Sequence, residues 1–471
     1  MPAGFGFGLR RRFGSMASSG FGATPRGTFD YLPERMEELR RVESAARQVV
    51  ELRGYREIAT PTLELAALFE KSLGATSDVV GKEMYRLKTG GKRGQSLTLR
   101  PEGTAPVMRA VVGNGMLQSL PQLLYYSGPM FRHERPQKNR YRQFHQFGIE
   151  CVGPSAPEAD AEIIESAAAF LNSVGLREGI ELHLNTLGNA ESLGRYQWML
   201  QQHFQDWLSS GQKLSIESKT RLKNRAPLRI LDSKDVDDKE AILRAPLITR
   251  DALSDDCLAR MERVENCLDA LGVPFLRNPR LVRGLDYYSH SVFEFVDKAS
   301  GAAVLAGGRY DGLAKHLGHK RAIPAAGWAA GLDRIISSLK EQGRESTVRP
   351  TPFFVLPALS STDPAALLSP ADGRVIAHAM RTAATLRASG FETQVIHGRK
   401  LAKAMGHASK KGALAVIIVG KADIDSGVVT LKVLDRDAGG AQQQHVHADD
   451  LPRAVASIAS SYRTNKTRTS F

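Results

Sequence analysis

The sequence predicts an α+β protein in which an antiparallel sheet, interrupted by a helical insertion, is followed by a separate α/β domain. Three observations predict this class. Strand-like segments recur between residues 97 and 185 and again between residues 281 and 297. Residues 190–277, between these two blocks, are rich in charge and mostly helical in pattern. Beyond residue 352 strands alternate with helices, which is typical of an α/β domain.

The first block begins with a helix. Apolar residues recur at helical spacing over Tyr31–Arg53 and stop before Gly54. Tyr55–Leu63 is predicted to be a strand interrupted at Pro61, which cannot donate to a ladder and therefore favours an edge or interface position. The block continues with strands at Leu97–Arg100, Leu123–Met130, Gln143–Val152 and Glu181–Asn185 and a helix at Ala159–Val174.

Ala190–Arg277 lacks strand alternation, which indicates an inserted helical subdomain. Strands are expected again at Leu281–Asp286 and Ser291–Asp297, and a helix is expected from Leu332. The polar, proline-containing segment Gly343–Thr351 predicts a linker. The elements predicted after it are strand Phe353–Leu356, helix Val375–Ser389, strand Glu392–Ile396, helix Leu401–Lys411, strand Ala413–Val419, a hairpin near Gly427–Leu434 and helix Leu451–Ser460.

Composition narrows the choice of partners. The 471 residues carry a formal net charge of +14, which favours nucleic acid first and an anionic membrane surface second. A basic protein that binds no polyanion is the alternative. Three cysteines without a CxxC pair support neither a disulfide framework nor a zinc ribbon, and they favour a reducing compartment. No apolar run approaches the roughly 18 residues that span a bilayer, so we expect a soluble protein.

The first 29 residues contain four arginines and no acidic residue. This composition is typical of a mitochondrial targeting segment, and a disordered basic tail is the alternative. Met16 could serve as an internal start that removes the cluster Arg10–Arg12. The expected location is the cytoplasm, with the mitochondrion as a second destination.

The strongest candidate for a ligand site is Phe131–Glu150, FRHERPQKNRYRQFHQFGIE, in which a proline-containing turn joins two strands. Strand side chains alternate between faces, so Phe144, Gln146, Gly148 and Glu150 share one face of the second strand. Arginine forks bind phosphate oxygens bidentately and an aromatic ring can stack on a base, so this face predicts a binding floor. The cations beside it are Arg132, Arg135, Lys138, Arg140 and Arg142.

Two further segments carry candidate residues. Glu102 and Thr104 lie two apart in LRPEGT and could together hold an ammonium group, although a surface turn is the alternative. In LVRGLDYYSHSVFEF, Arg283 precedes Gly284, whose missing side chain allows close approach to a ligand. An exposed arginine beside two part-buried tyrosines is the alternative there.

A last segment, AAGWAAGLDR, places Arg334 near the start of a helix, and tight packing of small residues is its alternative interpretation. Taken together, the candidates offer arginines for phosphates, carboxylates for a cationic ligand and Arg283 for a carboxylate. An amino acid has the ammonium and the carboxylate, and a nucleoside triphosphate has the phosphates. The combination therefore indicates carboxylate activation by adenylation.

The motifs FRHERPQKNRYRQFHQFGIE, RGLDYY, AGGRYDGL, LRPEGT and GLDR, in the places they occupy, resemble the histidyl-tRNA synthetases, which are class II aminoacyl-tRNA synthetases. GYREIATPTLE, with Pro61, resembles the dimer-interface motif of that class, and RGTFDYLP resembles the family's usual N-terminal motif. The resemblance runs from about Arg26 through the C-terminal domain and is weakest in the insertion. It implies a basic tail over residues 1–25, a catalytic domain over 26–342 with its insertion at about 190–277, a linker over 343–352 and an anticodon-binding domain over 353–471.

The resemblance also implies a role for each matching residue. Arg283 and Arg132 would be catalytic. ATP would be bound by Arg132, Glu134, Arg140, Phe144 and Arg334. Histidine would be bound by Glu102, Thr104, Gln146, Glu150, Arg283, Tyr287 and Tyr288. The tRNA acceptor end would meet Arg135, Gln137, Lys138 and Arg142.

The implied reaction has two steps. The carboxylate of histidine attacks the α-phosphorus of Mg-ATP, which gives histidyl-adenylate and releases pyrophosphate, and the 3′ hydroxyl of tRNA(His) then takes the histidyl group from the adenylate. Positioning and charge neutralisation would supply most of the acceleration, which agrees with the lack of a nucleophile motif. The implied partners are ATP with Mg²⁺, histidine, tRNA(His) and a second copy of the chain, without a protein-bound metal or a membrane. A catalytically inactive regulatory or histidine-sensing paralogue is the alternative.

Two further details concern the third motif and the C-terminal lysines. Asp333 stands where the third motif commonly has glutamate, which puts the bracing of Arg334 in doubt. The C-terminal lysines would face the anticodon, and a solvated helix face is their alternative interpretation. These lysines are Lys400, Lys403, Lys410 and Lys411.

Overall fold

The computed structural model describes residues 23–74, 77–88, 95–134, 140–344, 353–359, 369–434 and 442–468. The chain divides into two compact units, Met1–Glu345 and Ser346–Phe471. Across the described ranges, no helix combines the length and apolarity needed to cross a membrane.

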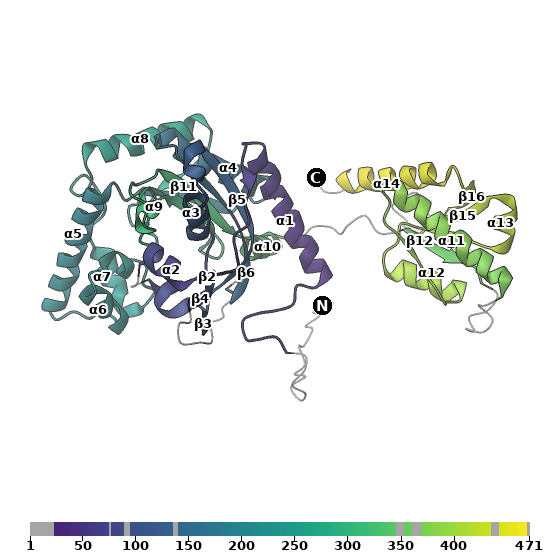
Figure 1. The fold of residues 1–471 in the computed structure, drawn as a ribbon, viewed down its shortest axis with the longest axis horizontal. Coiled ribbons are helices and arrows are strands. Elements are labelled where there is room, and N and C mark those ends of the chain that lie inside the picture. The colour runs from purple at the N-terminus through teal and green to yellow at the C-terminus, as the bar shows by residue number, and fades with distance from the viewer. Residues whose placement is uncertain are drawn as a thin grey trace, which may run out of the picture. The chain divides into compact units, whose positions relative to one another are not determined.

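The first unit is built on an eight-stranded sheet in the order β1-β5-β6-β11-β10-β9-β7-β8 (Figure 1). Neighbours from β5 to β7 pair antiparallel, as predicted, while the short edge strands β1 and β8 pair parallel to their neighbours. The strands are β1 (Arg56–Glu57), β5 (Gln122–Phe131), β6 (Gln143–Val152), β7 (Ile180–Thr186), β8 (Leu276–Arg277), β9 (Ser289–Asp297), β10 (Ala302–Arg309) and β11 (Ala325–Gly331).

Each face of the sheet has its own hydrophobic core. Phe147 and Ile149 of β6 point into a core that includes side chains of α1 (Pro33–Glu51), α4 (Pro157–Ser173) and α10 (Leu332–Glu341). Phe144 packs against the other core, confirming the predicted alternation along this strand. That second core contains residues of α2 (Ala66–Leu73), α3 (Thr104–Gly113) and α9 (Leu313–His316).

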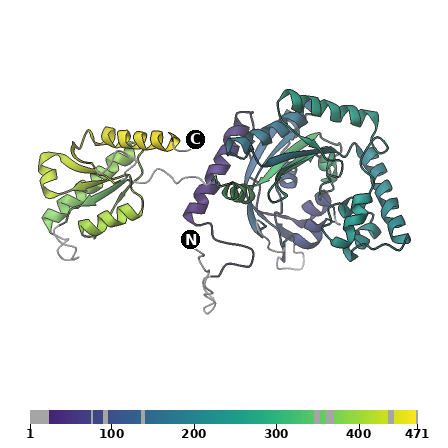
Figure 2. The same ribbon diagram turned by 180° about the vertical axis from the view of Figure 1, so that it is seen from behind.

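The helical insertion packs against this second core. Figures 1 and 2 show its helices gathered at one side of the unit, next to α2. A later helix, α8 (Asp255–Ala270), instead buries Met261, Val264 and Leu268 in the core on the first face, so this part of residues 190–277 belongs to the cover of the sheet. The insertion comprises α5 (Ala190–Ser209), α6 (Ile216–Lys223), α7 (Lys239–Arg244) and 3₁₀ turns at Pro227–Ile230 and Val236–Asp238.

Two predicted strands are wrong. Leu281–Asp286 is a loop between β8 and β9. The segment Tyr55–Leu63 is split by its proline: β1 joins the large sheet, and Leu63 opens β2 in a separate three-stranded sheet of order β2-β4-β3. The remaining small elements of this unit are β2 (Leu63–Leu65), β3 (Arg86–Lys88), β4 (Ser96–Leu99), a π-helical turn (Val79–Glu83) and a 3₁₀ turn (Met116–Ser119).

The second unit is a five-stranded sheet in the order β13-β12-β14-β15-β16, with parallel pairing among the first three strands and antiparallel pairing after them. The alternation of strand and helix is confirmed, and the short α13 was not predicted. The two strands of the predicted hairpin are present as the antiparallel pair β15 and β16, although the predicted span near Gly427–Leu434 holds only the first of them. Its elements are β12 (Phe353–Pro357), α11 (Pro370–Ala388), β13 (Thr393–Val395), α12 (Leu401–Lys410), β14 (Ala415–Val419), α13 (Lys421–Ser426), β15 (Val428–Val433), β16 (Gln443–His447) and α14 (Leu451–Arg468).

Candidate active site

Glu150 lies at the floor of the candidate site, on the same sheet face as Phe144. Its side chain is only 2% exposed, and it accepts hydrogen bonds from the hydroxyl of Thr104 at 2.8 Å and from the hydroxyl of Tyr310. Burial raises the pKa of the Glu150 carboxyl well above its usual range. Among the described residues its hydrogen-bond partners are neutral hydroxyls and no cation pairs with it, so a cationic or N–H-donating ligand would complement this carboxyl group.

Close approach of β11 to β6 makes this floor possible. Gly327 pairs with Glu150 across the two strands. A Cβ atom on Gly327 would lie 2.5 Å from Oε2 of Glu150 and 2.8 Å from the hydroxyl of Tyr310. Only glycine fits there, so the close approach of the two strands depends on Gly327.

Glu102 lies two residues before the start of α3. Its carboxylate accepts the backbone N–H groups of Thr104 at 2.7 Å and of Ala105 at 3.0 Å, so it satisfies two donors that a helix N-terminus leaves free. The side chain is 4% exposed, so the surface-turn alternative is wrong. Burial raises its pKa. Each carboxylate oxygen keeps a second lone pair for a ligand.

Arg283 and two tyrosines come from the loop before β9. The guanidinium of Arg283 forms an ion pair with Glu294 of β9 and lies 5.9 Å from the ring centre of Tyr288. Its Nε is buried without a hydrogen-bond partner. Tyr287 and Tyr288 are buried, and both rings contact Tyr310, so the loop packs directly over the Glu150 side of the site.

The arginines gather around the outer end of β6. The guanidinium of Arg132 lies 5.5 Å from the ring centre of Phe144, while its Nε donates to the carbonyl of Pro101 at 2.9 Å. Arg140 pairs with Glu134 at 3.2 Å. Burial lowers the pKa of Arg334, and repulsion from Arg140 and Arg132 lowers it further. Cations that repel one another in a partly buried site would be stabilised by a bound polyanion.

Comparisons with known proteins agree with this arrangement. A family model described as histidyl-tRNA synthetase matches residues 27–335, and one described as anticodon binding domain matches residues 365–458. The chain belongs to the histidyl-tRNA synthetase family.

Relatives of this family match nearly the whole chain. The histidine–tRNA ligase of Gluconobacter oxydans (strain 621H) is 42% identical over 434 residues, covering 92% of this chain and 98% of the relative. That of Rhodospirillum rubrum is 43% identical over 412 residues, covering 87% and 94%. The apo histidyl-tRNA synthetase structure of S. aureus superposes with a TM-score of 0.72 at 29% identity, covering 92% of this chain and 99% of that one. The α+β class II synthetase fold predicted from the sequence is confirmed.

Asp333, the departure from the synthetase motif, contacts the N-terminal segment. It accepts from the hydroxyl of Tyr31 and from Arg35, both at 2.8 Å, and from the backbone N–H of His145 at 3.0 Å. It therefore ties α10 to α1 and to β6. Arg334, the next residue, donates to the carbonyl of Ala303 at 3.0 Å.

The predicted tRNA contacts fall mostly outside the described residues. Arg135, Gln137 and Lys138 lie there, whereas Arg142 is described and donates to the carbonyl of Glu134 at 3.3 Å. Gln146 lies on β6 with its Oε1 buried and without a hydrogen-bond partner.

Two residues of the site were missed from the sequence. Tyr310 was available in the motif AGGRYDGL, yet nothing in its spacing predicts contact with Glu150, 160 positions away. In β9, Glu294 lies on the same face as Val292, as strand alternation predicts. Its ion pair with Arg283 depends on how the preceding loop folds, which the sequence pattern does not predict. Next to Tyr310, the fully buried Arg309 is paired with Asp160, which fixes the end of β10.

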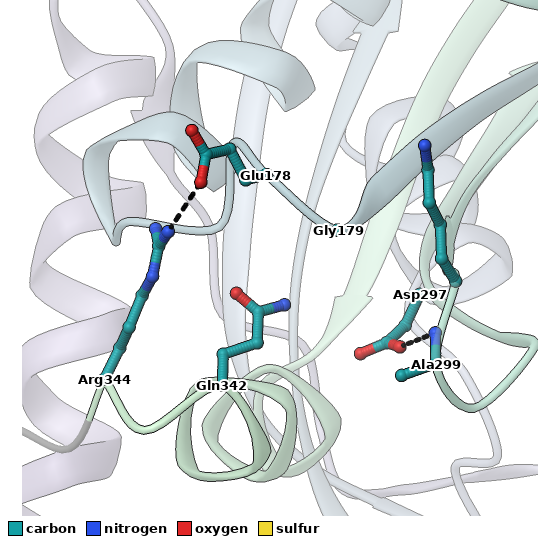
Figure 3. A pocket seen from close by; sticks show the side chains of 7 residues that line it. Glu178, Gly179, Asp297, Ala299, Gln342 and Arg344 are labelled. Carbon is teal, nitrogen blue, oxygen red and sulfur yellow. Dashed lines mark hydrogen bonds and ion pairs between the residues drawn. The ribbon is translucent and has the colours of Figure 1, made fainter.

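A separate open pocket lies at the turn after β9. Figure 3 shows Arg344 reaching Glu178, with a distance of 3.3 Å between them, and Asp297 bonded to the backbone of Ala299. The pocket measures about 520 Å³ and contains none of the predicted site residues. In the described part of the chain, no cluster of three or more His, Cys, Asp or Glu residues could hold a metal ion.

Proposed function

We propose that the chain activates histidine with ATP to form histidyl-adenylate and transfers the histidyl group to the 3′ end of tRNA(His). The observation that carries this proposal is the position of the buried Glu150, which lies among tyrosines on the same sheet face as the arginine cluster. A buried acceptor for a small N–H donor would thus lie beside a group of cations that suits phosphates.

Histidine would bind with its imidazole toward Glu150 and Tyr288. The imidazole has two ring nitrogens, and a carboxylate acceptor favours a donor N–H on the nitrogen that faces it. Tyr287 contributes to the wall of this pocket, and we add Tyr310, whose hydroxyl bonds Glu150. The α-amino group would lie near Glu102, Thr104 and Gln146, whose side-chain oxygens retain acceptor capacity.

ATP would occupy the outer end of β6. Phe144 would stack on adenine, and Arg132 and Arg334 would bind the phosphates. Glu134 and Arg140, already paired at 3.2 Å, would hold the nucleotide between them. Mg²⁺ would arrive with ATP and shield the phosphate charge. Glu134 offers it a carboxylate, and magnesium commonly takes one or two carboxylates together with phosphate oxygens.

Arg283 would exchange partners during the reaction. In the structure it pairs with Glu294. When histidine binds, its carboxylate would compete for the same guanidinium, and the charge that develops on the α-phosphate would then face this guanidinium. Arg283 and Arg132 would in this way stabilise the transition state by position and charge, without a protein nucleophile.

The tRNA would meet the basic residues that follow β5 in the sequence and the lysines of the second unit. Arg135, Gln137, Lys138 and Arg142 are the proposed contacts to the acceptor end, and the lysines of α12 and its flanks would face the anticodon.

Charging of tRNA(His) with labelled histidine tests the full reaction. We expect charging that weakens steeply as salt rises, since phosphate contacts release counterions. Charging of another tRNA, or none, would overturn the proposal.

We also propose that the chain acts as a homodimer. Leu63, Leu65 and Leu87 are 40–48% exposed and come from neighbouring positions of the small sheet that follows Pro61. Exposed apolar clusters of this kind are typical of interfaces. Leu65→Asp should weaken dimerisation at least about tenfold by placing a charge in that face.

Sedimentation velocity at a series of concentrations measures the effect. The matched control is Val236→Asp, an apolar residue of the insertion that is 81% exposed, which should leave the dimer intact. A wild-type chain that sediments as a monomer contradicts the dimer.

The proposed location is the cytoplasm, where tRNA and ATP meet. The mitochondrial alternative depends on the composition of residues 1–29, of which residues 1–22 lie outside the described part. Microscopy of the full chain fused to a fluorescent protein distinguishes the two destinations.

A further inference from the structure

A single arginine of the insertion reaches the loop that carries Arg283. Arg229, in the 3₁₀ turn between α6 and α7, is 6% exposed. Its Nη2 lies 2.5 Å from Oδ1 of Asp286, and its Nη1 donates to the carbonyl of Gly284 at 3.5 Å. Gly284 and Asp286 belong to the four residues from Arg283 to Asp286 that lead into Tyr287. The insertion therefore holds the backbone and a side chain of this loop.

The same guanidinium also contacts the end of α2. Nη2 of Arg229 lies 3.4 Å from the carbonyl of Leu73. Asp286 lies directly against Gly74, where a Cβ would be 3.1 Å from the Cγ of Asp286 and would clash with its Oδ2. Gly74 has a positive φ of 79°, which favours glycine. Three segments distant in sequence thus meet at Arg229.

Arg229 is itself held in place. Its backbone carbonyl accepts from Arg221 at 2.9 Å, and Arg221 forms ion pairs with Glu217 at 2.7 Å and with Asp78 at 2.8 Å. Ordering a flexible side chain costs conformational entropy. Because the backbone of Arg229 is already held by Arg221, less entropy is lost when its guanidinium orients the neighbouring loop.

Stability alone does not explain this pair. A buried arginine with a half-exposed carboxylate partner contributes little net stability, because desolvation offsets the attraction. Asp286 is 48% exposed, whereas Arg229 is nearly fully buried and its Nε has no hydrogen-bond partner. What the contacts do fix is the orientation of the loop between Arg283 and the tyrosines of the histidine pocket.

We propose that Arg229 is a positioning residue for histidine activation, through which the helical insertion holds the Arg283–Tyr287 loop in its reactive arrangement. Its effect on catalysis rests on the proposed role of Arg283. Arg229 contacts Gly284, Leu73 and Asp286, and none of these is among the residues proposed to bind ATP. Its removal should therefore act on histidine binding and turnover through the loop, and should leave the ATP site unchanged.

The test compares Arg229→Ala, Asp286→Asn and the double variant in histidine-dependent pyrophosphate–ATP exchange. Each single change should lower kcat/KM for histidine by about tenfold to hundredfold, the cost of a small misplacement of a reacting group. The KM for ATP should change less than about twofold, as expected when the nucleotide contacts are intact. The double variant should be no worse than the poorer single variant, since both remove one interaction.

Two controls separate positioning from folding. Arg229→Lys keeps the charge and should restore part of the loss, because a lysine can pair with Asp286 but cannot reach the two carbonyls as well. Arg244→Ala breaks an exposed ion pair with Glu240 elsewhere in the insertion and should leave the exchange rate unchanged. Asp286 is half-exposed, so Asp286→Asn should disturb folding less than Arg229→Ala does. It therefore still tests the positioning role if Arg229→Ala fails to fold.

Pyrophosphate–ATP exchange by the wild-type chain distinguishes a failure of the proposed function from a failure of the positioning role of Arg229. Without histidine-dependent exchange in the wild-type chain, the proposed function fails. If the wild-type chain is active and Asp286→Asn keeps its kcat/KM for histidine, the positioning role is refuted. Equal losses toward histidine and ATP, or additive losses in the double variant, would also refute it.

Discussion

Arg283→Ala should lower histidine-dependent pyrophosphate–ATP exchange by at least about 10³-fold, because it removes the positive charge that we propose stabilises the transition state. The residue is positioned for this role by the loop before β9, and its guanidinium already faces a carboxylate, Glu294. In the reaction the histidine carboxylate and the α-phosphate would replace that partner. Both kcat and kcat/KM for histidine should fall.

The change should leave the fold intact. Arg283 is 20% exposed and lies in a loop, so its removal creates no core cavity, and the melting temperature and sedimentation of the variant should match those of the wild-type chain. Glu294→Gln is the matched control: it removes the partner and keeps Arg283, so its loss should be far smaller. Retained exchange in Arg283→Ala, with a folded chain, would show that the carboxylate clamp has been misassigned.

Glu150→Gln should raise the KM for histidine and lower kcat/KM by at least about 10²-fold, since a site built to hydrogen-bond one ring loses strongly when its buried acceptor is changed. Thr104 and Tyr310 would still surround the amide, so the pocket keeps its shape. Exchange measured at increasing histidine concentration separates lost binding from lost turnover. Wild-type kcat/KM in this variant would remove Glu150 from the histidine pocket.

The same variant has a stability signature with a definite sign. Burial raises the pKa of Glu150 above its unfolded value of about 4.3, so between the two values the folded chain binds more protons than the unfolded chain. The wild-type chain therefore loses stability as pH rises through this window, and the amide does not titrate. The melting temperature of Glu150→Gln minus that of wild type should increase with pH, and a difference that shrinks with pH contradicts the buried carboxyl.

Strand alternation in Gln143–Val152 predicted correctly how the side chains divide between the two faces of the sheet, with Phe144 on one face and Phe147 and Ile149 on the other. The same method missed β10 and β11. Their alanines and glycines carry almost no hydrophobic contrast. In β11 the small size of Gly327 is what the site needs, since a Cβ would collide with Glu150. Small side chains allow β11 to approach Glu150 closely, and the same small side chains leave no hydrophobic alternation that would reveal a strand.

The sequence could predict that site residues lie close together only where they share one short motif. Arg132, Phe144, Gln146 and Glu150 share one segment, so their proximity follows from local geometry. Contacts such as Tyr310 with Glu150 depend on the order of strands in the sheet, which a period-2 pattern does not encode. The strand predicted at Leu281–Asp286 is wrong because its apolar first residues resemble a strand, whereas the segment is a loop. Arg229 of the insertion holds this loop by tertiary contacts, which the local sequence does not encode.

The measurement that tests the central claim most directly is pyrophosphate–ATP exchange by the purified full chain with each of the twenty amino acids in turn. Histidine alone should stimulate exchange, because Glu150 and the tyrosines around it suit an imidazole and Arg283 suits its carboxylate. Exchange that depends on a different amino acid, or on none, would contradict the assignment of this site to histidine activation.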